Sequence, residues 1–168
     1  MARRTRYQRR DALIVMQADF TDQPEHIPEL VKRFEGGADV VATERAPSRR
    51  APKSVRRLSR LAPWVLRPFV RIDGVRDPCT TFRLYRISVV RDLLKAAGDS
   101  PVASHAGWAA NVEWLLAAAP FARRVETVAL DARYDLRPRP SRVRPFADAL
   151  SLSRFGWSTR ARRVQPAS

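Results

Sequence analysis

The sequence predicts an α/β domain with a mixed sheet flanked by helices, because strand-like and helix-like stretches alternate along it. Residues 12–16 are apolar and lead into the polar Gln17-Ala18-Asp19, a pattern typical of a buried strand followed by a turn. A helix is expected over 29–35, and Gly36-Gly37 ends it. Residues 38–43 begin a second strand. This strand–helix–strand unit places Asp19 at the carboxyl end of the first strand, where open α/β sheets bind ligands.

The composition is that of one globular domain with a basic surface. The chain has 168 residues, of which 45% are hydrophobic, and its net charge of +15 favours an anionic partner. We divide it into a basic tail over 1–10, a domain over 11–150 and a tail over 151–168. Cys79 is the single cysteine and cannot form an internal disulfide, which fits a reducing, cytoplasmic location. The basic start precedes only a short, interrupted apolar run, so it predicts neither a secretory signal nor a membrane span.

A basic amphipathic segment follows the second strand and a proline-rich loop. Between residues 55 and 72, apolar residues fall on one side of a helical wheel and arginines on the other. The apolar side holds Val55, Leu58, Ala62, Val65 and Phe69, and the basic side holds Arg56, Arg57, Arg60, Arg67 and Arg71. Pro63 and Pro68 predict two short helical pieces rather than one. The segment either packs on the sheet or lies on the surface of an anionic membrane, which would attach the protein peripherally to the inner face of that membrane.

The remaining elements follow from periodicity and from glycine and proline. Helices are expected over 88–97, ending at Gly98, and over 108–119, and a strand over 125–130. A last helix is expected over 146–155, and the final residues are expected to be frayed.

The segment Arg76-Asp-Pro-Cys-Thr-Thr-Phe-Arg-Leu-Tyr-Arg86 carries several donors suited to a phosphate. Threonine hydroxyls donate single hydrogen bonds, and the guanidinium groups of Arg76 and Arg83 can donate in bidentate fashion. Asp77 either caps the turn, positions an arginine or supports a metal site, and the sequence leaves these open.

This segment, Gln17-Ala18-Asp19 and Gly37-Ala-Asp-Val-Val41 together resemble family 2 glycosyltransferases of the GT-A type. The resemblance is to the group that includes dolichyl-phosphate mannose synthase and bacterial polyprenyl-phosphate relatives. Several positions in these motifs depart from the family pattern: Gln17 stands where the family has Asp, Thr80 where it has Ser and Thr81 where it has Gly, and Cys79 also differs. The resemblance covers residues 11 to about 145. The first strands of the family, which bind the nucleotide, have no counterpart here, so we expect an incomplete GT-A (Rossmann-like) sheet and an isolated chain of doubtful activity.

The resemblance implies roles for named residues. A divalent cation, Mg²⁺ or Mn²⁺, would be held by Asp19 and Gln17, since hard cations take oxygen ligands. The acceptor phosphate would be bound by Arg76, Thr80 and Arg83. The donor diphosphate would be bound by Arg139, Ser141 and Arg142. Glu113, on the helix expected over 108–119, is either a partner of a loop arginine, which we favour, or a helix-surface residue.

The resemblance therefore implies transfer of a hexose from a nucleotide-sugar to a polyprenyl phosphate or a related lipid acceptor of the cell envelope. The alternative, from another functional class, is a non-catalytic basic module that binds an anionic membrane surface or nucleic acid. Specific nucleic-acid binding is not expected, because no such motif is present and the four tryptophans are not interleaved with arginines.

Overall fold

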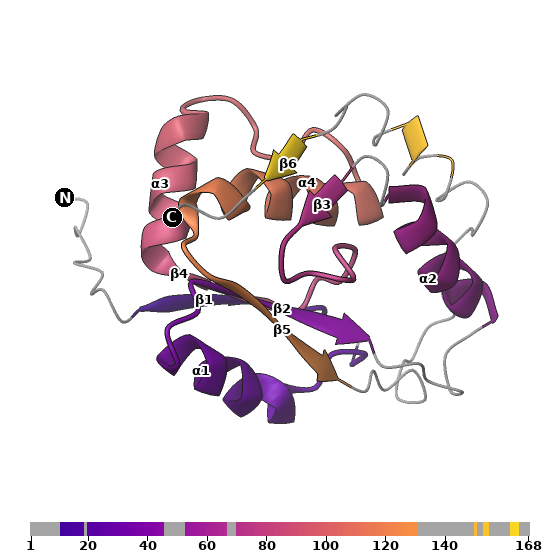
Figure 1. Ribbon diagram of the computed structural model, residues 1–168, viewed down its shortest axis with the longest axis horizontal. Helices are drawn as coiled ribbons and strands as arrows, with labels where there is room; N and C mark the ends of the chain where they lie inside the picture. Colours follow the sequence, from indigo (N-terminus) through magenta and orange to yellow (C-terminus); the bar gives the residue numbers. More distant parts are fainter. Residues whose placement is uncertain are drawn as a thin grey trace.

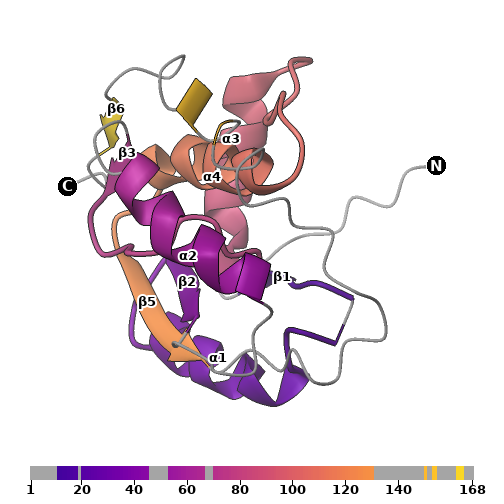
Figure 2. The ribbon, with the colours of Figure 1, turned by 90° about the vertical axis from the view of Figure 1, so that its right-hand side faces the viewer.

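The computed structural model describes residues 11–18, 20–45, 53–66, 70–130, 150, 153–154 and 162–164. Within them a four-stranded open sheet carries helices on both faces, as Figures 1 and 2 show. The predicted fold class, α/β with a mixed sheet flanked by helices, is confirmed.

The sheet is mixed because one strand runs against its neighbours. The strands are β1 (Ala12–Val15), β4 (Arg83–Arg86), β2 (Val40–Arg45) and β5 (Val125–Leu130), in the order β1-β4-β2-β5. Strand β4 is antiparallel to β1 and β2, and β2 is parallel to β5. The carboxyl ends of β1, β2 and β5 therefore share one edge of the sheet with the amino end of β4, and we call this the carboxyl edge.

One face of the sheet is covered by α1 (Ile27–Glu35), which follows the short 3-10 helix η1 (Pro24–His26). Leu30 and Phe34, one turn apart on α1, are buried against the sheet. Gly37, with φ of +102°, turns the chain back into β2, and this left-handed backbone favours glycine. The core on this side consists of Leu30, Phe34, Ala38, Val41, Phe82, Leu84 and Val128.

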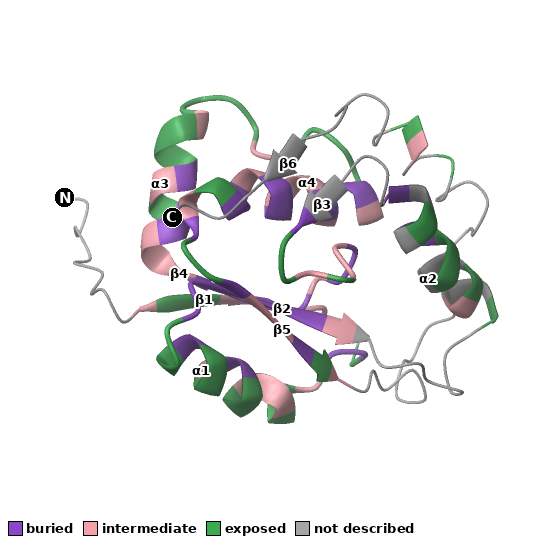
Figure 3. Ribbon diagram, in the orientation of Figure 1, coloured by how far each residue is buried: buried purple, intermediate pink, exposed green. Residues whose placement is uncertain are grey.

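The other face is covered by α2 (Lys53–Leu66), α3 (Ile87–Ala97) and α4 (Trp108–Ala118), the last continued by the 3-10 helix η2 (Ala119–Phe121). Alternate strand residues face the two sides: Val40 and Tyr85 join the core under these helices, whereas their neighbours Val41 and Leu84 join the α1 core. Figure 3 shows buried segments of α3 and α4 turned toward the sheet. The central strands β4 and β2 are thus buried on both faces. Strand β1 was expected to be buried, but it lies at the edge of the sheet beside β4 and none of its residues is buried, so that expectation was wrong.

Two predictions about local structure were wrong. Residues 53–66 form one helix with Pro63 inside it, not two pieces. Burial of Ala62 and Leu66 offsets the backbone donor that proline removes. Residues 70–72, expected within the amphipathic segment, form β3 (Val70–Ile72), which pairs in parallel with β6 (Arg162–Val164). The last residues are therefore not all frayed.

Several other predictions are confirmed or lie outside the description. The helices expected over 29–35, 88–97 and 108–119 correspond to α1, α3 and α4. Of the helix expected over 146–155, only residues 150, 153 and 154 are described, and they are helical. No helix among the described residues is both long and apolar enough to cross a bilayer.

Candidate functional site

Two of the predicted motifs meet at the carboxyl edge of the sheet. Gln17, two residues past β1, donates from Nε2 to the hydroxyl of Thr81 over 3.3 Å. The amide of Asn111, on α4, donates to the same hydroxyl over 2.9 Å and to the carbonyl of Cys79 over 3.1 Å. The end of β1, the loop before β4 and helix α4 are therefore joined through one threonine.

The 76–82 loop is also tied to the end of β2. Thr80 donates its hydroxyl to the Thr43 carbonyl over 2.7 Å, and Thr43 donates its own to the Phe82 carbonyl over 2.8 Å. The backbone N–H of Arg76 donates to the Glu44 carboxylate over 3.2 Å. Thr80 is only 1% exposed. Its hydroxyl therefore donates within the fold, and the binding of an acceptor phosphate by Thr80, which the resemblance implied, stays a prediction.

Arg83 is an internal anchor of this loop. It is 2% exposed, and its guanidinium donates to the carbonyls of Pro78 and Asn111 over 2.5 and 2.7 Å. A third hydrogen bond, of 3.2 Å, reaches the Tyr85 hydroxyl, while Nε has no hydrogen-bond partner. All three acceptors are neutral, and no carboxylate of the described residues pairs with it. Arg83 thus joins the loop to α4 from beneath, and this burial does not favour direct contact with a substrate.

Arg76 occupies a different environment on the same loop. Its side chain is exposed, and its guanidinium makes no polar contact with another described residue. Asp77, beside it, accepts the N–H of Cys79 over 3.0 Å and so caps the turn, which is one of the three roles left open by the sequence. A held turn that carries a free guanidinium is suited to binding an anion.

Glu113 does not pair with a loop arginine, so that preference was wrong. Its carboxylate accepts both the N–H and the hydroxyl of Ser104 over 2.9 Å, and the N–H of His105 over 3.1 Å. The His105 ring lies 3.0 Å away. Burial raises the pKa of Glu113. The hydrogen bonds from His105 and Ser104 together lower it by more, so the pKa lies below its ordinary value. The donors to Glu113 therefore come from the loop that precedes α4 and not from an arginine.

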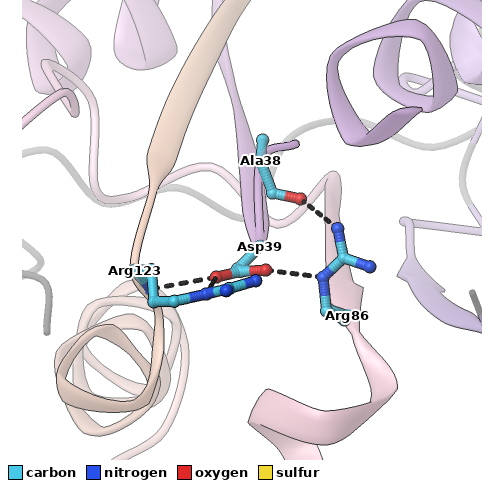
Figure 4. A network of polar contacts seen from close by, with 4 residues as sticks. All are labelled: Ala38, Asp39, Arg86 and Arg123. Atoms are coloured by element: carbon cyan, nitrogen blue, oxygen red, sulfur yellow. Dashed lines mark hydrogen bonds and ion pairs between the residues drawn. The ribbon is translucent and has the colours of Figure 1, made fainter. Parts of the chain in front are cut away.

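The opposite edge of the sheet holds a closed ionic network, drawn in Figure 4. The buried carboxylate of Asp39, just before β2, accepts from Arg86 Nε over 2.5 Å and from the Arg123 backbone and Nε over 3.0 and 3.2 Å. Arg86 also donates to the Ala38 carbonyl over 3.1 Å and lies 4.3 Å from the centre of the Phe34 ring. Burial raises the pKa of Asp39, yet these arginines bring it below its ordinary value. The network joins β2, β4 and the segment after η2.

Four of the predicted site residues, Asp19, Arg139, Ser141 and Arg142, lie outside the described residues. The described part of the chain brings no three metal-binding side chains together. Near Gln17, the carboxylate of Asp22 accepts the Gln17 N–H over 2.8 Å. Binding of a metal by Asp19 and Gln17 stays a prediction.

Sequence reasoning missed Asn111 and assigned a role to the hydroxyl of Thr80 but none to that of Thr81. A signal for Asn111 was present, since it is an amide in the otherwise apolar run Trp108-Ala-Ala-Asn-Val, and a partly buried amide needs partners. For Thr81 the available signals were its hydroxyl, in a segment rich in phosphate donors, and its departure from the family glycine.

The comparisons with known proteins agree with this architecture. A model of the family described as Glycosyl transferase family 2 matches residues 4–94, more than half of the chain. No curated protein matches the sequence.

Proposed function

Because the chain belongs to glycosyl transferase family 2, we propose that it acts in moving a hexose from a nucleotide-sugar to a polyprenyl phosphate or a related lipid-linked acceptor. The observation that carries this proposal is the contact of Gln17 with Thr81, which links the two motifs of the resemblance at one edge of the sheet. That edge is where open α/β sheets bind ligands.

Such a transfer requires little proton transfer by the protein. The acceptor phosphate is already an anion, so one of its oxygens can attack the sugar carbon with inversion and without a strong general base. The bond from that carbon to the donor diphosphate breaks, and the nucleoside diphosphate leaves with the electron pair. The work is to hold two anionic groups close together, and cationic donors do this. We assign the acceptor phosphate to the exposed Arg76 and give Arg83 the role of holding its loop.

To test this assignment, acceptor saturation is compared in wild type, Arg76→Gln and Arg76→Lys. We expect at least a tenfold rise in the acceptor KM for the glutamine variant and a smaller one for lysine, which keeps charge but loses bidentate geometry. The matched control is Arg91→Gln, an exposed arginine on α3 beside Asp92. Equal acceptor KM values for the Arg76→Gln and Arg91→Gln variants would contradict the assignment.

The donor side is proposed to use Mg²⁺ or Mn²⁺ held by Asp19 and Gln17, with Arg139, Ser141 and Arg142 at the diphosphate. When bound, such a cation neutralises charge on a diphosphate leaving group. Gln17 fits this role through Oε1, because its Nε2 is engaged by Thr81. Calorimetry should show that Asp19→Asn weakens metal-dependent nucleotide-sugar binding at least tenfold and that Gln17→Asp tightens metal binding. Unchanged binding in Asp19→Asn would contradict the proposal that a metal ion binds at this position.

Attachment to an anionic membrane surface is proposed as a second property, and one face of α2 supports it. Lys53, Arg57 and Arg60 are exposed along this face together with Leu61, 41% exposed, and Trp64, 83% exposed. Each of these residues lies three or four positions from another of them, so they share one side of the helix. Cations beside an exposed tryptophan suit the boundary between headgroups and acyl chains. In Figure 1, the arrowheads of β2 and β5 point to the side of the molecule where α2 lies.

The face differs from the one predicted by the helical wheel. Ala62, placed on the membrane side by that prediction, is buried in the core together with Leu66. The side chains of Val55, Leu58, Val65, Phe69, Arg67 and Arg71 lie outside the description. The lipid-facing residues are therefore proposed to be Leu61 and Trp64.

Vesicle flotation tests this property. Binding to vesicles that contain anionic lipid should fall roughly fivefold for each of Arg57→Gln and Arg60→Gln, since a surface charge is worth about 1 kcal/mol there. Trp64→Ala should weaken binding further. The control changes Arg91, Leu94 and Lys95 on the exposed face of α3, which has a similar composition but no tryptophan. Equal losses from both helices, or equal flotation on neutral vesicles, would contradict a specific face.

A further inference from the structure

We infer that the hydroxyl of Thr81 is a hydrogen-bond donor to a phosphate oxygen of the substrate, aimed by Gln17 and Asn111. This inference rests on the proposed function and names a binding group that the resemblance does not supply, since the family has glycine at this position.

The first support is the way the hydroxyl is bonded. A threonine hydroxyl offers two acceptor lone pairs and one proton. Gln17 Nε2 and Asn111 Nδ2 both donate to Oγ1, over 3.3 and 2.9 Å. With both lone pairs occupied, the remaining capacity of the hydroxyl is to donate. Its proton has no acceptor among the described residues, so the structure presents a donor whose direction is fixed by two neighbours.

The second support is the contrast with Thr80, the next residue back. Thr80 is buried, and its proton is given to the Thr43 carbonyl. Thr81 is only partly buried, and it stands on the same loop as the exposed Arg76. Of two adjacent hydroxyls, one is therefore used by the fold and the other is left for a ligand.

The third support is that two of the departures from the family pattern contact each other. Gln17 replaces an aspartate and Thr81 replaces a glycine, and a hydrogen bond donated by residue 17 to residue 81 needs both replacements. A glycine has no hydroxyl to receive the Gln17 amide. An aspartate at 17 would be an acceptor, and it would draw the Thr81 proton to itself.

The ligand that fits is an oxygen anion, because a fixed neutral donor on the same loop as an exposed guanidinium is suited to phosphate oxygens, which form charge-assisted hydrogen bonds. Such an oxygen belongs either to the lipid-linked acceptor or to the nucleotide diphosphate. The edge on which Thr81 lies is shared by both predicted motifs, so the two sources are separated by experiment.

The experiment measures binding by calorimetry with two probes, a twenty-carbon prenyl phosphate in detergent micelles and a nucleoside diphosphate with Mg²⁺. The proteins are wild type, Thr81→Val, which keeps the shape without the hydroxyl, and Thr81→Ser, which restores the hydroxyl. Thr127→Val, at a partly buried threonine of β5, is the matched control. Thermal melts show that each variant is folded.

We expect Thr81→Val to weaken one probe about tenfold, the loss of one hydrogen bond to a charged group, and Thr81→Ser to bind within a few fold of wild type. The probe that weakens identifies the source of the phosphate. Asn111→Ala should weaken the same probe, and the double variant with Thr81→Val should lose less than the sum of the two, because the residues act together.

Two results would overturn the inference. If Thr81→Val binds both probes as wild type does while Arg76→Gln loses one of them, the proposed function stands and Thr81 is only structural. If wild type binds neither probe, both the proposed function and the role of Thr81 fail.

Discussion

The two ends of β4 carry arginines three residues apart, and the structure uses them in opposite ways. At the carboxyl end, Arg86 pairs with the buried carboxylate of Asp39, which also holds Arg123. At the amino end, Arg83 is buried among neutral acceptors, and the loop before it presents Arg76 and the hydroxyl of Thr81. The first end satisfies its charges within the fold, whereas the second keeps donors available.

This difference shows that arginine content does not locate a site in a chain of net charge +15. Both ends belong to the same motif, and both would read as phosphate-binding from charge alone. What separates them is the set of partners, because a carboxylate neutralises an arginine and a carbonyl only orients it. Substitutions at Asp39 and at Arg83 remove the interactions of each end in turn.

The largest effect is expected from Asp39→Asn. The substitution removes the carboxylate that two arginines share, and loss of one partner of a buried pair costs about 3 kcal/mol. Chemical denaturation should show that loss in the free energy of unfolding, with phosphate binding at the other end unchanged in the folded protein. Asp92→Asn, in the exposed pair with Arg91, is the control and should change stability by less than about 0.5 kcal/mol. A similar, small loss of stability in both variants would contradict a stabilising role of the Asp39 network.

A somewhat smaller effect is expected from Arg83→Lys. Lysine keeps the charge but cannot reach the carbonyls of Pro78 and Asn111 with the same fork, so the variant should lose about 2 kcal/mol of stability. Amide exchange in residues 77–81 should become faster. An unchanged melting temperature combined with lost acceptor binding would instead give Arg83 direct contact with the acceptor.

The smallest effect is the acid dependence of the closed end. The folded-state pKa of Asp39 lies below its ordinary value of 3.8, since the arginine hydrogen bonds outweigh the effect of burial. This contribution to stability is therefore complete above the unfolded pKa and is lost as the pH falls through the folded pKa. The stability difference between wild type and Asp39→Asn should be constant from about pH 5 to pH 7 and should shrink below about pH 4. A difference that grows in acid would reverse the sign of the assigned shift.

The sequence predicted the elements well where one force dominates. The apolar run at 12–15 and the glycines after Glu35 define β1 and the end of α1 locally. Pro63 misled the prediction, because tertiary burial of Ala62 and Leu66 outweighs one lost backbone hydrogen bond. The pairing of β3 with β6 joins residues about ninety positions apart, and three-residue strands carry little local signal.

The site was predictable as a place but not as a set of contacts. Motif matches identified Gln17 and the 76–86 segment, and the structure brings them to one edge, yet the motifs could not tell the exposed Arg76 from the buried Arg83. That distinction depends on α4, whose Asn111 closes over the loop. Glu113 was given an arginine partner because its neighbours on the helix are mostly apolar and a buried carboxylate needs a partner, whereas the backbone of the adjacent loop supplied the donors.

The most direct test of the account is to follow backbone amide signals by NMR while a prenyl phosphate, and then a nucleoside diphosphate with Mg²⁺, is added. We expect shifts at Gln17, residues 76–81 and Asn111, at the carboxyl edge of the sheet. We expect no shifts at Asp39, Arg86 and Arg123. Shifts confined to the Asp39 network, or spread equally over both ends of β4, would contradict it.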